Sequence, residues 1–206
     1  MLFTLKDRLT RALLRLWLSG ARYVCFSDSE WYGTLPKSGQ SVLLLANHIS
    51  WWDGIWVFLQ NEKLWKRSFH ALMLENELQK RPFLRTLGGI PLSKGRQMTQ
   101  CVEDLRHFLK TPDGLLLIFP ESEIKSTQEF KHHFKLGLVK RIYSEAGHIC
   151  LLFQGVEYAN RPRPISFHFV KTITLAEVDG IEQVYHDFVM DSRKIIAQRV
   201  LAINQA

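Results

Sequence analysis

Cysteine is scarce in this chain of 206 residues, which contains only Cys25, Cys101 and Cys150. The three are widely spaced, are odd in number and form no Cys-x-x-Cys pair. A disulfide framework and a zinc site are therefore not expected, and we assign no metal to the chain. A few unpaired thiols favour a reducing compartment.

Long apolar runs are also missing. No run approaches the roughly 18–20 residues that a membrane-spanning helix needs, so we expect no transmembrane span. The N-terminal segment is not typical of a secretory signal, because Lys6, Asp7 and Arg8 interrupt its apolar stretch. The sequence shows no internal repeat and no low-complexity tract. We expect a protein of the cytoplasm or of the cytoplasmic face of a membrane, held there as a peripheral or monotopic protein.

Acidic residues are outnumbered: 20 Asp and Glu stand against 27 Lys and Arg, a formal net charge of +7. Such an excess favours an anionic partner, namely nucleic acid, anionic lipid or a phosphorylated carrier, and it is equally compatible with a surface that only keeps the protein soluble. No nucleic-acid-binding motif is present, so we expect no nucleic acid partner. Hydrophobic residues make up 46% of the chain, which is enough for a sizeable core.

Residues 2–18 have the periodicity of an amphipathic helix. Apolar residues recur on one side, and Arg8, Arg11 and Arg15 gather on another. Such a helix suits the interface of a lipid bilayer, and it suits packing on the protein's own core equally well. We assign residues 1–40 to an N-terminal membrane-surface helix and a linker. The apolar residues of this helix are Leu2, Leu5, Leu9, Leu13, Leu16 and Trp17.

Apolar runs and helical periodicity alternate along residues 41–206. We predict strands at 41–46, 70–74, 90–92, 115–119, 149–153 and 165–171, the last at an edge of the sheet. We predict helices at 53–61, 78–87 with an interruption at Pro82, 98–110, 136–146 and 181–203. Residues 27–40 are polar and rich in turn-forming residues. The alternation predicts an α/β fold, a single domain with a mostly parallel sheet flanked by helices.

Polar residues follow three of the predicted strands. In an open parallel sheet, ligands bind beyond the carboxyl ends of the strands. We therefore expect these polar residues to line one crevice. They are Asn47 and His48 after 41–46, Ser93 and Lys94 after 90–92, and Pro120, Glu121 and Ser122 after 115–119.

His48 and Asp53 form a candidate catalytic pair. A histidine can remove a proton from an attacking hydroxyl near neutral pH. A carboxylate bonded to its other ring nitrogen sets the tautomer and the orientation. Four intervening residues allow a strand-to-helix turn to bring Asp53 back onto His48. The structural alternative is a histidine that caps a helix, with Asp53 near the positive end of the helix dipole.

Four short blocks follow one another between residues 47 and 137. They are Asn47-His48-Ile49-Ser50-Trp51-Trp52-Asp53, Gly89-Ile90-Pro91-Leu92-Ser93-Lys94, Phe119-Pro120-Glu121-Ser122 and Phe134-Lys135-Leu136-Gly137. In content and order they resemble the blocks of the glycerolipid acyltransferase family, of the lysophosphatidate acyltransferase type, whose first block is His-x4-Asp. The ordered set is more specific than any single block.

The resemblance implies a reaction of phospholipid biosynthesis or related lipid metabolism. A fatty acyl group would pass from acyl-CoA or acyl carrier protein to a hydroxyl or amine of a lipid-like acceptor, at a membrane surface. It implies His48 as general base, Asp53 as the group that orients it, no cofactor besides the thioester co-substrate, no metal and no acyl-enzyme. Glu121 would bind the acceptor. The substrate-binding residues in and beside the matched blocks would be Asn47, Gly89, Lys94, Glu121, Ser122 and Lys125.

The chain departs from the family pattern at several positions, three of them in or beside the second and third blocks. Lys94 stands in place of an arginine that contacts the acceptor phosphate, Ser122 in place of a glycine, and Ile124, beside Lys125, in place of a further arginine. Lysine keeps the charge but loses the bidentate fork, so we expect an acceptor other than lysophosphatidate. Two other functions stay open: a lipid or thioester hydrolase, although no Gly-x-Ser-x-Gly elbow is present, and a non-enzymatic module that binds anionic lipid.

Overall fold

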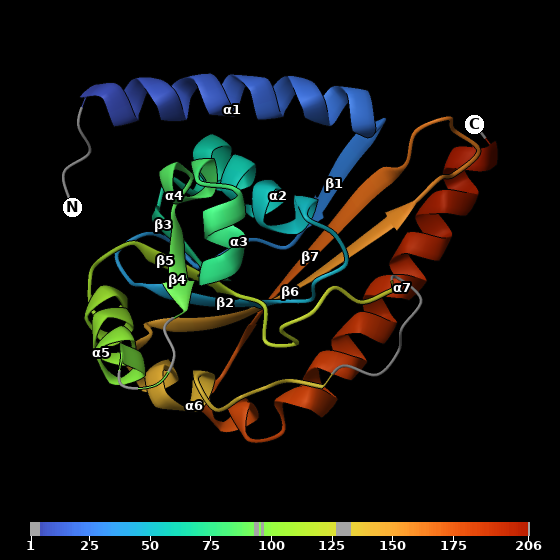
Figure 1. The fold of residues 1–206 in the computed structure, drawn as a ribbon. Helices are drawn as coiled ribbons and strands as arrows, with labels where there is room; N and C mark the ends of the chain where they lie inside the picture. Colours follow the sequence, from blue (N-terminus) through green and yellow to red (C-terminus); the bar gives the residue numbers. More distant parts are fainter. Residues whose placement is uncertain (1–4, 93–94, 96, 127–132, 206) are drawn as a thin grey trace.

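The computed structural model describes residues 5–92, 95, 97–126 and 133–205. Seven strands form one sheet: β1 (Asp28–Tyr32), β2 (Val42–Ala46), β3 (Ser68–Leu74), β4 (Gly89–Leu92), β5 (Gly114–Ile118), β6 (His148–Glu157) and β7 (Ile165–Ile173). Their order is β1-β7-β6-β2-β5-β3-β4 (Figure 1). The strands β6, β2, β5, β3 and β4 run parallel to one another. β7 is antiparallel to β6, and β1 is parallel to β7. The predicted α/β fold with a mostly parallel sheet is confirmed.

Helices cover both faces of the sheet (Figure 1). One apolar cluster joins α1 (Leu5–Cys25), α2 (Trp52–Gln60) and α4 (Phe83–Thr86) to one face. A second cluster joins α5 (Gln97–Leu109), α6 (Val139–Ile142) and α7 (Ile181–Gln205) to the other face. The short helix α3 (Glu75–Lys80) packs beside β3 and β4. Helical turns at Asn61–Trp65, Tyr143–Glu145 and Leu175–Val178 complete the layers.

The strands β2 and β5 lie side by side at the centre of the sheet. Every residue of β2 is buried, and so is every residue of β5. Strands that are covered on both faces lose the alternation of polar and apolar residues and become continuous apolar runs. This is why the runs at 41–46 and 115–119 could be recognised as strands, and both predictions are confirmed.

Two predictions about the sheet and one about a helix were wrong. The turn-rich stretch 27–40 contains β1, and β1 rather than 165–171 forms this edge of the sheet. The strand was missed because this half-buried edge strand, with the sequence Asp-Ser-Glu-Trp-Tyr, carries no apolar run. A boundary at residue 40 would separate β1 from the sheet to which it is bonded. The helix predicted at 136–146 is confined to α6 and the following turn.

Helix α1 turns most of its apolar side away from the protein. Leu18 is fully buried, and Arg11 bonds to Glu62 at 2.8 Å, so one side of the helix packs on the domain. Within the described ranges, no helix is both long and apolar enough to cross a membrane. The outward side consists of Leu9, Leu13, Leu16, Trp17 and Val24, each exposed by 59% to 74%. We call these five residues the outer stripe.

A histidine is buried between the sheet and α2. His168 on β7 is 1% exposed and stacks on Trp31, with ring centroids 4.2 Å apart. Its Nδ1 lies 3.2 Å from Oε1 of Gln154, and its Nε2 has no hydrogen-bond partner among the described residues. Burial lowers the pKa of His168 to about 3, so the ring is neutral at physiological pH.

Replacing His168 with Phe should flatten the dependence of stability on pH. The unfolded histidine binds a proton below its ordinary pKa of 6.5, whereas the folded one does so only near 3. The native state therefore loses stability as the pH falls from 6.5, by about 2 kcal/mol at about pH 5. Urea unfolding at about pH 7.5 and about pH 5 measures this loss in the wild type and in His168→Phe. The exposed His107→Phe is the control. An equal loss in His168→Phe and in the wild type would contradict the assignment.

Candidate active site

The turn that follows β2 brings His48 and Asp53 together. Asp53 lies in the first turn of α2, and its Oδ2 is 2.9 Å from Nδ1 of His48. The same oxygen accepts the backbone N–H groups of Ile49 at 2.7 Å and Ser50 at 2.8 Å. Oδ1 accepts the Ser50 hydroxyl at 2.9 Å. Asp53 is 2% exposed, and its buried carboxylate takes part in four hydrogen bonds, as a buried charge requires.

This geometry selects one tautomer of His48. An ionised carboxylate can accept hydrogen bonds but cannot donate them, so the ring proton lies on Nδ1 and the lone pair lies on Nε2. The ring stacks on Phe119, with centroids 4.3 Å apart and planes inclined by 22°. The His48 side chain keeps 23% of its surface exposed, against 2% for Asp53. His48 is thus a partly exposed base whose Nδ1 is held by a buried carboxylate.

The loop after β5 holds the backbone of His48 on both sides. The N–H of His48 donates to Oε2 of Glu121 at 3.3 Å, and its carbonyl accepts the N–H of Lys125 at 2.7 Å. Glu121 is 2% exposed, and the Nζ of Lys125 lies 3.0 Å from Oε1 of Glu123. Ser122 has φ of +63°, the left-handed region that glycine enters without steric cost. A glycine at this position, as in the family pattern, would meet the same requirement.

Asn47 joins β2 to β6 beyond the last residue of β2. Its Oδ1 accepts the N–H of Gln154 at 2.8 Å, and its Nδ2 donates to the carbonyl of Gln154 at 2.9 Å. The side chain is 2% exposed. Its amide group therefore continues the pairing of the two strands, immediately before His48. The predicted role of Asn47 in substrate binding stays a prediction.

Tyr185 is a site residue that the sequence did not reveal. It comes from α7, is fully buried, donates to the carbonyl of Leu152 at 2.9 Å and accepts the N–H of Asn47 at 3.2 Å. Burial, and then the charge of Glu121, raise the pKa of Tyr185 well above its ordinary value, so the hydroxyl stays protonated. In the sequence it is one aromatic residue in an amphipathic helix, and nothing marks its hydroxyl as bonded 138 residues away.

The third predicted strand end lies apart from the other two. β4 is separated from β5 by β3, which places its end about 10 Å from that of β5. Lys94 lies outside the described residues. Gly89 begins β4, and an added Cβ would lie 2.8 Å from the carbonyl oxygen of Leu84, so its lack of a side chain serves packing. The structure thus brings together His48, Asp53, Glu121, Ser122 and Lys125.

The described part of the chain contains no group of three or more His, Cys, Asp or Glu residues that could hold a metal ion. The chemical capacity of the site is that of a base, His48, held by a carboxylate and by the backbone.

Fold and site together define an α/β protein with a histidine–aspartate pair at the carboxyl end of its central parallel strand. The model of the Acyltransferase family matches residues 29–150, more than half of the chain. The protein therefore belongs to the acyltransferase family, and this membership supports an enzyme that transfers acyl groups. No curated protein matches the chain in sequence. The matched range contains His48, Asp53 and the loop after β5, whereas Tyr185 lies beyond it.

Replacing Tyr185 with Phe should lower the free energy of unfolding by about 1 kcal/mol. The change removes the bond to the carbonyl of Leu152 and the bond from the N–H of Asn47 while keeping the ring. Urea denaturation measures the loss. Tyr158→Phe is the matched control, because Tyr158 is 63% exposed. Equal stability of the two variants would show that the buried hydroxyl does not hold the end of β2.

Proposed function

We propose that the protein transfers a fatty acyl group from the thioester of acyl-CoA or acyl carrier protein to a hydroxyl or amine of a lipid-like acceptor. The observation that carries the proposal is the bond of 2.9 Å between Nδ1 of His48 and Asp53. It leaves the lone pair of Nε2 on the more exposed side of the pair. Membership in the acyltransferase family supplies the reaction class.

The proposed reaction proceeds by direct attack. Nε2 of His48 takes the proton of the acceptor hydroxyl or amine as the acceptor atom bonds to the thioester carbonyl carbon. The carbon–sulfur bond then breaks, and the leaving thiolate receives the proton from Nε2. Asp53 stabilises the transient imidazolium and preserves the orientation of the ring. The two steps conserve the proton and need no acyl-enzyme.

The surrounding residues support the base and the substrates in different ways. Glu121 accepts the backbone N–H of His48 and so helps to hold the base; its contact with the acceptor stays a prediction. Lys125 brings a cation beside the site, suited to the phosphates of the donor. Lys94, in place of an arginine, favours an acceptor other than lysophosphatidate.

His48→Ala should lower acceptor-dependent release of thiol by at least about a hundredfold, because general-base assistance is lost. Asp53→Asn should have an effect of similar size, because the amide no longer fixes the tautomer. The assay follows thiol release from acyl-CoA and from acyl carrier protein, with and without a panel of lysolipids, lipid amines and lipophilic alcohols. His133→Ala, at an exposed position, is the control.

The same assay separates the alternatives. A hydrolase would release thiol without any acceptor, and a lipid-binding module would release none. Release that is indifferent to His48 would refute the proposed mechanism. Preference for lysophosphatidate over every other acceptor would refute the inference from Lys94.

We also propose that the protein works on a lipid surface to which α1 docks. The outer stripe runs along one side of α1, while Arg11 and Arg22 turn toward the domain, where Arg11 bonds to Glu62 and Arg22 lies 5.7 Å from the Trp56 ring. Exposed leucines with a tryptophan suit the boundary between headgroups and acyl chains. An acceptor and a donor with long hydrocarbon chains would be encountered there.

The double variant Leu13→Gln/Trp17→Gln should lose binding to lipid vesicles, because it removes the centre of the outer stripe. Co-sedimentation with vesicles of zwitterionic lipid, and of zwitterionic lipid mixed with anionic lipid, measures the loss. Arg15→Gln, on another side of the same helix, is the control and should lower binding only to anionic vesicles. Undiminished binding of the double variant would show that α1 is not the docking element.

A further inference from the structure

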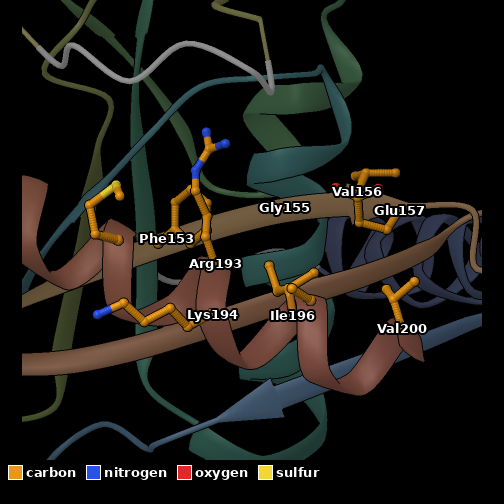
Figure 2. Close-up of a pocket in the computed structure, with 10 residues that line it drawn as sticks. Phe153, Gly155, Val156, Glu157, Arg193, Lys194, Ile196 and Val200 are labelled. Carbon is orange, nitrogen blue, oxygen red and sulfur yellow. The ribbon is translucent and has the colours of Figure 1, made fainter. Parts of the chain in front are cut away.

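A groove of about 530 Å³ lies between β6 and α7 (Figure 2). All of its lining residues come from these two elements, and none of them belongs to the candidate site. Phe153 in this groove packs in the apolar cluster of α5, α6 and α7, whereas Phe119 packs against the cluster of α1, α2 and α4. The surroundings of the His48 ring are therefore set on the other face of the sheet, where the ring stacks on Phe119.

The register of the two central strands places Phe119 beside His48. Leu117 of β5 pairs with Leu44 of β2, and both side chains lie in the cluster on the α2 side of the sheet. Side chains alternate between the two faces along a strand, so Phe119, the second residue after Leu117, points to this side as well. Phe119 directly follows β5, and His48 comes two residues after β2. The register thus brings both rings to the same end and the same face of the sheet.

The position of the Phe119 ring is fixed by the elements around it. The carbonyl of Phe119 accepts the N–H of Ser122 at 3.1 Å, which closes the turn in which Ser122 has φ of +63°. On the side of α2, a Cβ added to Gly54 would lie 4.0 Å from Cε2 of Phe119, so the backbone of this helix borders the ring. Phe119 is therefore held between β5, the turn and α2, and its ring can fix the plane of the His48 ring.

The stacked arrangement also acts on the charge of His48. The two ring centroids are 4.3 Å apart and the planes are inclined by 22°, so Phe119 presents the face of its ring. The face of an aromatic ring carries partial negative charge and attracts a cation within about 6 Å of its centre. In the proposed reaction Nε2 of His48 takes a proton, and the imidazolium forms within this distance. Asp53 stabilises this cation at Nδ1, and Phe119 stabilises it across the face of the ring.

We propose that Phe119 is a positioning residue of the reaction: its ring fixes the plane of the His48 ring and stabilises His48 in the protonated form. The inference rests on the proposed function and adds to it a residue that has no ionisable group. A side chain of the same shape without a negative ring face would keep the packing but lose the stabilisation of the cation. Shape and charge can therefore be separated by experiment.

Several charged residues near His48 also affect its protonation. Asp53 bonds to Nδ1 at 2.9 Å, and Glu121 accepts the backbone N–H of His48 at 3.3 Å. Lys125 donates its N–H to the carbonyl of His48, and its Nζ lies 3.0 Å from Oε1 of Glu123. A test of the aromatic face must leave these four residues in place, so it should change the charge distribution of the ring and nothing else.

The test replaces Phe119 with pentafluorophenylalanine, which keeps the shape of the ring while its fluorine atoms remove the negative charge from the face. Nuclear magnetic resonance of the His48 ring, assigned with His48→Ala, follows protonation and requires no substrate. The pH at which half of the His48 rings carry a proton should fall by at least about half a unit, because the protonated form loses a favourable contact.

The matched control is the same replacement at Phe153, whose ring centre lies 5.7 Å from the guanidinium of Arg193 in the groove of Figure 2. It alters an aromatic face beside a different cation and should leave the protonation of His48 unchanged. An unchanged protonation of His48 in the protein altered at Phe119, or an equal change in the two altered proteins, would overturn the inference.

The second readout is the pH profile of kcat/KM for acceptor-dependent thiol release. In the protein altered at Phe119, the acid limb should move to lower pH and kcat should fall at least about threefold, because the imidazolium formed in the reaction is less stable. A lower kcat with an unmoved acid limb would show that Phe119 only packs, and would overturn the inference while leaving the proposed function intact. Absence of thioester turnover in the wild type would instead refute the proposed function, and the resonance comparison would then decide on Phe119 by itself.

Discussion

The pairing of β2 with β5 on one side and with β6 on the other is the constraint on which the site depends. Both edges of β2 are bonded, so a shift of the strand would break two ladders at once, and a shift by one residue would turn its side chains to the opposite faces. His48 stands two residues beyond this strand, and Asn47 extends the pairing to β6 across the gap. The base thus takes its position from the most buried part of the sheet, and a rigid element holds it more accurately than a free loop could.

The polar residues around His48 are buried and fix its position, whereas the His48 ring itself stays partly exposed. Asp53, Glu121 and Asn47 are each 2% exposed and bonded within the protein, so removing any partner would leave another buried group unsatisfied. The His48 ring is the part that remains accessible. The hydrogen-bonded network therefore restricts the motion of His48 and leaves its Nε2 for chemistry. The carboxylate of Asp53 can be buried because each of its hydrogen bonds is made within the protein.

The parts of the fold that could be predicted are those that a short stretch of sequence determines. The apolar runs of β2 and β5 and the spacing from His48 to Asp53 are visible in short stretches of sequence, and the strand-end rule joins His48 to Glu121. The remaining features depend on distant partners. β1 owes its strand conformation to β7, and Tyr185 owes its role to a carbonyl on β6, so neither leaves a local pattern. The periodicity of α1 predicted a helix with an apolar side, but which side faces the domain was decided by contacts such as Arg11 with Glu62.

The edge formed by β1 has a consequence for how the protein is made. The hydroxyl of Ser27 bonds to the carbonyl of Pro164, a separation of 137 residues, and β1 pairs with β7 just beyond. A ribosome makes α1 and β1 before β7, the strand with which β1 pairs. Contacts over such a distance also form slowly, because a long loop has to close first. Until β7 has been made, the outer stripe of α1 therefore lies beside a sheet that lacks this edge.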